Sequence, residues 1–193
     1  MSTPVRRAEA SDLRGVVEIL GDAFEDDPVM RWVTRKASYP RYAFALTLPV
    51  SLPYGLTHIA SDGTGAVSWL PPRVELDSPI SAGVVWKGLT QYGPGSLLRA
   101  LSTLSLIREH HPKEEHYYLF AIGTLRSSRG RGVGSALIRQ GLARCDDEQK
   151  PAYLESSNAD NLPFYRRHGF EVIDEVRLPR KGPAMYLMWR VPR

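Results

Sequence analysis

A glycine-rich and arginine-rich stretch, residues 122–135, has the residue types and spacing best suited to binding a ligand. It holds three glycines at alternate positions and two arginines before and between them: Gly130, Gly132, Gly134, Arg129 and Arg131. Glycine lets the backbone approach a ligand closely, because no Cβ stands in the way. A loop that runs directly into a helix also points unpaired N–H groups one way, at the positive end of the helix dipole. The stretch therefore predicts a phosphate or pyrophosphate site.

Two familiar nucleotide-binding patterns do not fit this loop. A P-loop needs a Gly-Lys-Ser/Thr sequence, which occurs nowhere in the chain. A dinucleotide fingerprint needs Gly-x-Gly-x-x-Gly, but its third position is Ser135 when counted from Gly130 and Leu137 when counted from Gly132. Both ligands are therefore disfavoured by the residues themselves.

The neighbouring segments would position this loop between a strand and a helix. The apolar run from His116 to Leu125 is typical of a central strand covered on both faces. From Gly132 to about Asp146, apolar residues recur at helical spacing. A short strand, Ala152 to Ser156, precedes a short helix from Asn161 to His168, which Gly169 ends as a C-cap.

The rest of the chain alternates strands and helices in a pattern typical of a mixed α/β domain. We expect Tyr39–Leu52 to be helical but broken at Pro49 and Pro53. Leucines at helical spacing between Ser81 and Glu109 favour core packing, with a lid over an acceptor site as the alternative. The other expected elements are a helix and five strands: Leu13–Phe24, Val5–Ala8, His58–Ala60, Ala66–Leu70, Phe170–Leu178 and Ala184–Val191.

Length and composition favour one domain, residues 1–193, with ordinary contents of 42% hydrophobic and 24% charged residues. No apolar run approaches the roughly 20 residues that would span a bilayer. The N-terminus lacks the apolar segment of a signal peptide, and the single cysteine, Cys145, cannot form an internal disulfide. These features predict a cytoplasmic protein that does not bind membranes.

The net charge of +4 does not by itself identify a partner. The basic residues are spread along the chain, with no run of five or more, so we expect no nucleic-acid partner. A few arginines focused on a polyphosphate cofactor account for the surplus equally well.

The stretch Arg129–Gly134 resembles the acetyl-CoA-binding motif of the GNAT superfamily of N-acetyltransferases, Arg/Gln-x-x-Gly-x-Gly/Ala. The second part of the family pattern follows: a strand at Tyr153–Ser157, then Asn161, Tyr165 and Gly169-Phe170. With the first helix and the next two strands included, the resemblance covers most of the chain.

A closer likeness is to the puromycin N-acetyltransferase type. It rests on Pro112–Glu114, Leu154–Ser156 and Asn161–Tyr165. The half of the chain that would bind the acceptor is much less alike, so puromycin specificity is not carried over.

The resemblance implies the GNAT fold: a mixed, mostly antiparallel sheet with a splayed central parallel strand pair, flanked by helices. It also implies transfer of an acetyl group from acetyl-CoA to a primary amine of a small molecule, such as an antibiotic or another metabolite. The amine would attack directly in a ternary complex. That chemistry needs a held thioester, a neutral amine and a proton for the leaving thiolate.

Eleven residues are the cofactor contacts that the resemblance implies. Backbone N–H groups of the loop, with the charge of its arginines, would hold the pyrophosphate, and the end of the preceding strand would pair with the pantetheine arm. Gly123 suits a close approach but could equally mark a bulge. The expected contacts are Ile122, Gly123, Thr124, Arg129, Gly130, Arg131, Gly132, Val133, Gly134, Ser135 and Asn161.

The resemblance implies Tyr165 as the general acid for the thiolate, and Glu155 is our first candidate for the general base. Strand alternation places Glu155 on one face with Tyr153 and Ser157. Structural roles remain open for each candidate: a helix N-cap for Asn161, a core aromatic for Tyr165 and a buried hydrogen-bonded carboxylate for Glu155.

Two other groups of residues compete for roles at the site. His116 and the acidic Glu25–Asp27 loop are rival bases, and that loop could instead attract a cationic acceptor. His110, His111 and His116 raise the possibility of a metal, but no carboxylate or thiolate pattern supports one, so we expect none.

Two alternative functions stay open at this point. One is acetylation of protein lysines or N-termini, and the other is a non-catalytic acyl-CoA-binding sensor domain. The sequence also leaves open the acceptor, the acyl-chain preference and whether the protein is a monomer or a homodimer.

Overall fold

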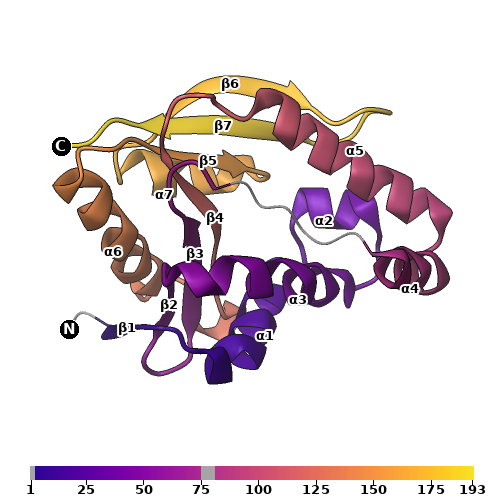
Figure 1. Ribbon diagram of the computed structural model, residues 1–193, viewed down its shortest axis with the longest axis horizontal. Helices are drawn as coiled ribbons and strands as arrows, with labels where there is room; N and C mark the ends of the chain where they lie inside the picture. The colour runs from indigo at the N-terminus through magenta and orange to yellow at the C-terminus, as the bar shows by residue number, and fades with distance from the viewer. Residues whose placement is uncertain (1–2, 75–80) are drawn as a thin grey trace.

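The computed structural model describes residues 3–74 and 81–193. Residues 1–2 and 75–80 of the predicted single domain lie outside this description. One seven-stranded sheet runs through the molecule with helices on both faces (Figure 1). Within the described residues, no helix is both long enough and apolar enough to cross a membrane.

The described residues form seven strands and seven α-helices, besides short 3-10 turns. The strands are β1 (Val5–Arg7), β2 (Thr57–Ala60), β3 (Gly65–Leu70), β4 (Tyr117–Thr124), β5 (Ala152–Ser156), β6 (Glu171–Arg177) and β7 (Ala184–Arg190). The helices are α1 (Leu13–Ala23), α2 (Pro28–Val33), α3 (Tyr39–Ser51), α4 (Ala82–Tyr92), α5 (Pro94–His110), α6 (Val133–Asp147) and α7 (Leu162–Arg166).

The sheet confirms the predicted mixed topology. Its strand order is β1-β2-β3-β4-β5-β7-β6, and β4 and β5 are parallel while every other neighbouring pair in the described sheet is antiparallel. The parallel pairing joins Tyr117 to Ala152 and Tyr118 to Tyr153, and in the described chain it goes no further. Since β4 continues to Thr124, the two strands diverge over their second halves.

A β-bulge lies in the middle of β4. Ser68 of β3 pairs with Ala121, but the next residue, Trp69, pairs with Leu119, so Phe120 is the extra residue. A bulge of this kind turns two successive side chains toward the same face. Phe120 and Ala121 accordingly pack together on the side of the sheet covered by α1 and α3.

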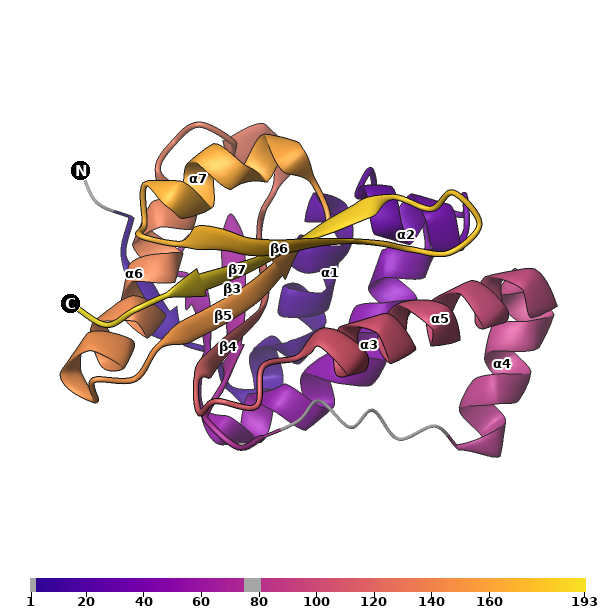
Figure 2. The same ribbon diagram turned by 90° about the horizontal axis from the view of Figure 1, so that it is seen from above.

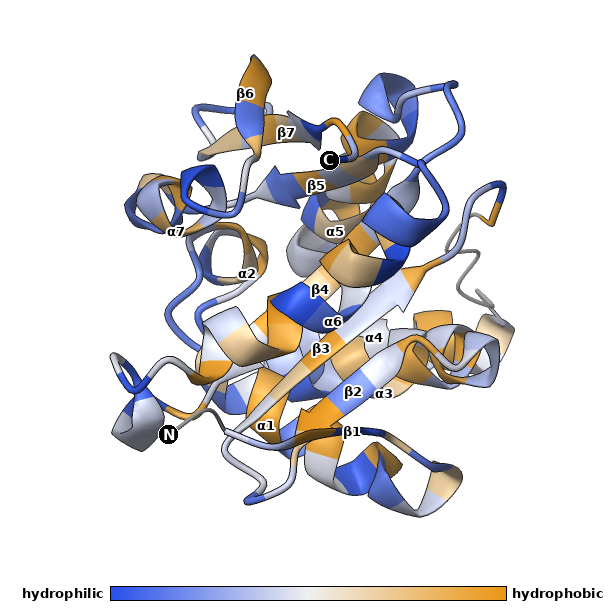
Figure 3. Ribbon diagram, turned by 90° about the vertical axis from the view of Figure 1, so that its left-hand side faces the viewer, coloured by the Kyte–Doolittle hydropathy of each residue, from blue (hydrophilic) through white to orange (hydrophobic). Residues whose placement is uncertain are grey.

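Two hydrophobic layers enclose the central strands. Helix α6 buries Leu137, Ile138 and Leu142 against one face, and α1 and α3 bury Leu20 and Leu48 against the other. Figure 3 shows hydrophobic segments on β3 and α1, with hydrophilic loops outside them. The resulting sandwich fixes the diverging ends of β4 and β5.

The predicted break of the third helix at Pro49 is wrong. Helix α3 continues to Ser51 with Pro49 inside it. Proline removes one backbone N–H donor. Because Pro49 lies in the last turn of α3, few helical hydrogen bonds follow it that could be lost. Leu48, fully buried against α1, holds this turn in place.

The predicted core packing of the α5 leucines is also wrong for several of them. Leu98 is 55% exposed, Leu101 41% and Leu104 45%. Helices α4 and α5 form a hairpin that extends away from the sheet (Figure 2), so their apolar residues cannot all reach the main core.

Candidate active site

The glycine loop enters α6 in a conformation that favours glycine at two positions. Gly130 has a φ of +78° and Gly132 a φ of +81°, in the left-handed region. A Cβ on either residue would meet no described atom within 4 Å, so open space lies beside both. Gly132 is the N-cap of α6 and has no side chain to satisfy the first helical N–H groups, which remain open to an anion.

Gly134, in the first turn of α6, faces α7. A Cβ on Gly134 would lie 3.4 Å from Cε2 of Phe164, and the Ser135 hydroxyl lies 3.1 Å from Nε2 of His168. The first turn of α6 is therefore packed beside the helix that carries Tyr165.

Glycine at position 123 is explained by helix packing. A Cβ there would lie 2.5 Å from Cβ of Ala23 and 3.2 Å from Cδ2 of Leu20, so α1 needs a glycine at this point of β4. The bulge of β4 lies three residues earlier, at Phe120, rather than at Gly123. The Ile122 side chain packs toward the core on the α6 side, which leaves the β4 backbone as the part that faces the diverging β5.

Asn161 does not act as the side-chain cap of α7. It is exposed, and in the described part of the chain its side chain makes no capping hydrogen bond. Asn158 instead caps the preceding 3-10 turn, residues 159–161, by accepting from the Asp160 N–H at 3.0 Å. Asn161 thus occupies the N-cap position of α7, as the structural alternative expects, but its side chain does not cap the helix.

Tyr165 is 9% exposed and packs between two aromatic rings, with centroids 5.2 Å from Phe164 and 6.1 Å from Phe170. Burial, reinforced by the negative charge of Asp27, raises the pKa of the Tyr165 hydroxyl. The phenol is therefore protonated at neutral pH, the state in which it can donate a proton.

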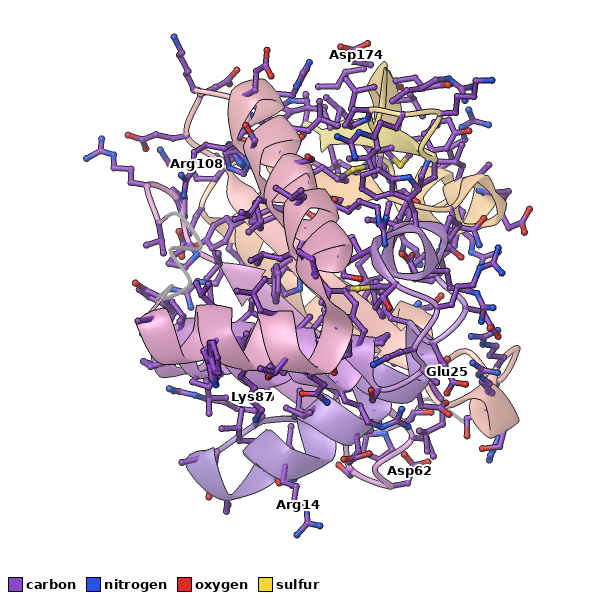
Figure 4. The ribbon with its side chains drawn as sticks, turned by 90° about the vertical axis from the view of Figure 1, so that its right-hand side faces the viewer. Arg14, Glu25, Asp62, Lys87, Arg108 and Asp174 are labelled. Carbon is purple, nitrogen blue, oxygen red and sulfur yellow. The ribbon has the colours of Figure 1, made fainter. Side chains whose placement is uncertain are left out.

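A cavity of about 780 Å³ lies between the loop after α1, helices α2 and α3, the α4–α5 hairpin and the sheet. Of the candidate site residues that the sequence singled out, Glu155, His111, His116 and Asp27 line it, whereas the glycine loop, Asn161 and Tyr165 do not. Figure 4 shows α4 and α5 crossing this side of the molecule. Residues of its wall from each layer include Phe24, Tyr39, Tyr42, Tyr92, Leu97, Ile107, Tyr118 and Phe120.

Glu155 is the buried carboxylate of this cavity. Its side chain is 4% exposed, and its Oε1 has no hydrogen-bond partner among the described residues. As alternation predicts, Ser157 lines the cavity with it while Leu154 packs into the core. Burial, reinforced by the charge of Glu155, raises the pKa of the neighbouring Tyr118 well above its ordinary value. Glu155 is buried as the structural alternative expects, but one oxygen is left unbonded.

The acidic loop after α1 divides its residues between two tasks. Asp27 caps α2 by accepting from the N–H groups of Val29 at 2.9 Å and Met30 at 3.0 Å, and its second oxygen contacts the Ser157 hydroxyl. Burial raises the pKa of Asp27. Asp26, by contrast, forms an ion pair with Arg126 at 3.0 Å, and Glu25 lies 3.7 Å from the same guanidinium.

This ion-pair group joins the acidic loop to the end of β4. The N–H of Arg126 also donates to the Asp22 carboxylate at 3.0 Å. Glu25 and Asp62, both labelled in Figure 4, lie on the side of the molecule where the glycine loop emerges, with Asp62 close enough to Arg131 to feel its charge. The tie between Asp22 and Arg126 carries no sequence signal, because it spans 104 residues.

Two groups of contacts at the cavity wall were not expected from the sequence. His111 reaches Glu155, with 3.7 Å between Nδ1 and Oε1, and Tyr39, Tyr42 and Tyr92 form an aromatic cluster with centroids 5.1–6.4 Å apart. Adjacent histidines at 110 and 111 were a visible signal. Their connection to the cavity depends on where α5 ends.

Neither the single cysteine nor a cluster of metal-binding side chains adds a further reactive group. Cys145 is buried, which raises its pKa to about 12 and keeps the thiol protonated. Among the described residues, no group of three or more histidine, cysteine and acidic side chains is arranged to hold a metal ion.

The chain is similar to known acetyltransferases in sequence. Residues 98–170 match the model of the acetyltransferase (GNAT) family. The uncharacterized N-acetyltransferase C550.08 of Schizosaccharomyces pombe is 26% identical over 199 residues, which cover 94% of this chain and 80% of that protein.

Solved structures share the architecture over the whole chain. The crystal structure of histone acetyltransferase HPA2 and related acetyltransferase from Corynebacterium glutamicum is 26% identical with a TM-score of 0.71, covering 100% of this chain and 98% of that one. Arylalkylamine N-acetyltransferase 2 from Aedes aegypti is 14% identical with a TM-score of 0.65, covering 98% and 99%, a likeness of fold. The fold of this chain is the GNAT fold.

Proposed function

We propose that this chain, an acyl-CoA-dependent acetyltransferase of the GNAT type, transfers the acetyl group of acetyl-CoA to a primary amine of a small molecule. The observation that carries the proposal is the cavity of about 780 Å³ with the buried, unbonded oxygen of Glu155 on its wall. Small-molecule sites commonly have about 300–1,000 Å³ and a few well-placed polar groups. A cationic amine would supply the hydrogen-bond donor that the Oε1 atom of Glu155 lacks.

Acetyl-CoA fits the geometry of the glycine loop and the diverging strands. Open space beside Gly130 and Gly132, together with the uncapped N–H groups of α6, suits a pyrophosphate. We assign that group to the backbone of residues 129–135, including Val133 and Ser135, with charge from Arg129 and Arg131. The pantetheine arm would lie along the backbone of residues 122–124, where β5 has diverged, with Asn161 as a further contact.

In the proposed reaction, Glu155 removes a proton from the acceptor ammonium and Tyr165 supplies a proton to the leaving thiolate. Acetyl-CoA, when bound, supplies the thioester carbonyl that the neutral amine attacks. The burial of Glu155 places the carboxylate inside the cavity, where its charge is poorly solvated and favours a cationic partner. The burial of Tyr165 keeps its proton until the thiolate forms.

Protein acetylation is a second candidate, because the similar structure from Corynebacterium glutamicum is that of histone acetyltransferase HPA2 and related acetyltransferase. We favour a small acceptor because the cavity, which residues of α3, α4 and α5 line, has the volume of a small-molecule site. The likeness to the puromycin N-acetyltransferase type places antibiotics that carry a primary amine among the acceptors to test. We further propose a cytoplasmic location.

The deciding experiment measures release of free CoA thiol from acetyl-CoA with a panel of amines. The panel contains puromycin, tyramine and spermidine as small amines, and a histone-tail peptide and a peptide with a free N-terminus as protein substitutes. Turnover with small amines alone is the expected result. Turnover with peptides alone would support protein acetylation, and acetyl-CoA binding without any turnover would support the sensor alternative.

A further inference from the structure

A short series of polar contacts joins two histidines to Glu155 at the wall of the cavity. His116 Nδ1 lies 2.6 Å from the backbone carbonyl of Glu114, and His116 Nε2 lies 3.1 Å from His111 Nε2. On the other side of its ring, His111 Nδ1 faces Glu155 Oε1 at 3.7 Å. All three side chains line the cavity.

The first two contacts determine which ring nitrogens carry hydrogen. A carbonyl oxygen only accepts hydrogen bonds, so Nδ1 of His116 must donate to Glu114. Burial lowers the pKa of His116, so its ring is neutral at neutral pH and its Nε2 is an acceptor. His111 Nε2 must therefore donate to it, so that whenever the His111 ring carries a single hydrogen its Nδ1 is a bare acceptor.

In that form, the facing atoms of His111 and Glu155 are two acceptors with no proton between them. Their separation of 3.7 Å is longer than a hydrogen bond, and Glu155 Oε1 has no other partner among the described residues. Two facing lone pairs repel each other, and the repulsion is strong where water is excluded. One proton placed between them would turn this repulsion into a hydrogen bond.

We propose that His111 and Glu155 act together as one base, which shares between Oε1 and Nδ1 the proton removed from the acceptor ammonium. His116 is a positioning residue that fixes the tautomer of His111. This inference rests on the proposed function, because it gives partners to the base of that reaction. In the step, an N–H bond of the ammonium breaks, its electron pair stays on nitrogen, and an O–H bond forms on Glu155. The proton leaves to solvent after turnover, so no further reactant is needed.

Among the groups around His111 and Glu155, these two residues are the ones that we propose exchange a proton. The rings of Tyr118 and Tyr153 lie 5.0 and 5.2 Å from the His111 ring, and burial raises the pKa of both hydroxyls, so both are neutral. The ring of Trp189 on β7 packs against His116. The other charged groups that act on this cluster or line the same cavity are Glu114, Asp174, Asp27, Arg73, Arg108, Glu109, Lys113 and Glu115.

The first test reads the tautomers directly, by nitrogen-15 NMR of the histidine rings in the full chain. We expect neutral His111 to carry hydrogen on Nε2 alone. His116→Leu should move hydrogen to Nδ1, and His116→Gln, which keeps an acceptor, should not.

The matched control is His110→Asn, because His110 bonds to Leu106 of its own helix at 3.0 Å. It should leave the His111 signals unchanged. Hydrogen on Nδ1 of neutral wild-type His111, or a His111 tautomer that is the same in His116→Leu as in wild type, would overturn the proposal. This measurement needs no acceptor, so it decides the proton site even if the amine panel shows no turnover and the proposed function fails.

The second test uses the panel amine with the highest wild-type turnover. His111→Asn should lower kcat about 10-fold to 100-fold, at the lower end for acid–base catalysis because Glu155 remains. It should also shift the acid side of the kcat/KM profile and leave the acetyl-CoA Kd unchanged. An unchanged profile in His111→Asn would contradict the shared base, whereas His110→Asn should match wild type throughout.

Discussion

Substitution of Gly132 should separate cofactor binding from stability. At a φ of +81° an alanine costs roughly 1–2 kcal/mol in backbone strain, and its Cβ meets no described atom within 4 Å, so no steric cost is added. For a chain of this size that strain lowers Tm by about 2–8 °C. If the pyrophosphate occupies this space, Gly132→Ala should also raise the acetyl-CoA Kd at least about tenfold, or ~1.4 kcal/mol.

Gly132→Asp makes the separation sharper. A carboxylate at the N-terminus of α6 interacts favourably with the helix dipole, by about 0.3–1 kcal/mol, which offsets part of the strain. The same charge would repel a pyrophosphate, so the acetyl-CoA Kd should rise by about 100-fold or more while Tm stays near that of Gly132→Ala. Calorimetric titration gives Kd and a thermal melt gives Tm.

The matched control is Gly63→Ala, in the turn between β2 and β3. Gly63 has a φ of +70° and also has no described atom within 4 Å of an added Cβ. Its loss of Tm should match that of Gly132→Ala, with acetyl-CoA affinity unchanged. If Gly132→Ala and Gly63→Ala bind acetyl-CoA equally well, the pyrophosphate assignment is refuted.

Three further predictions concern the proposed general acid Tyr165, the packing of α6 and the ion pair between Asp146 and Arg190. Tyr165→Phe should lower kcat about 100-fold or more without changing the acetyl-CoA Kd; equal kcat would show that the acid is another group. Gly141→Ala should destabilise the fold by about 1–3 kcal/mol in denaturant unfolding, because its Cβ would lie 2.7 Å from Cζ2 of Trp69, whereas Gly15→Ala, with no described atom within 4 Å, should not destabilise it. The Asp146–Arg190 ion pair, at 2.8 Å, lowers the pKa of Asp146 from 3.8. The contribution of the pair to the free energy of unfolding is therefore fully present above pH 3.8 and is lost as the pH falls through the lowered pKa of Asp146. Arg190→Met should remove that acid-dependent part of the unfolding free energy, and an unaltered pH dependence between pH 6 and pH 3 would contradict this.

Much of the fold was predictable because it depends on local patterns. The apolar run 116–125 predicted β4 at the centre of the sheet, and the glycine spacing predicted a loop at the start of α6. The break expected at Pro49 was wrong, because burial of Leu48 against α1 outweighs the lost donor. The bulge at Phe120 was not predictable, because it depends on register with β3.

The site divides in the same way. The residues of the glycine loop form one continuous segment, so their arrangement follows from their order along the chain. The approach of His111 to Glu155 spans 44 residues and is set by where α5 ends and β5 begins. Gly123 shows that one residue type can have a different cause from the expected one, since its small size is required by α1.

The acidic loop after α1 has a consequence for redesign of this protein. Asp26 anchors Arg126 at the end of β4, and the next residue, Asp27, forms part of the cavity wall. An engineer who reshapes this segment to admit a new amine therefore also disturbs the anchor of β4, the strand that we propose binds the pantetheine arm. The α4–α5 hairpin forms another part of the wall and has exposed leucines such as Leu98 and Leu101, so it is the part that can be exchanged with less effect on β4.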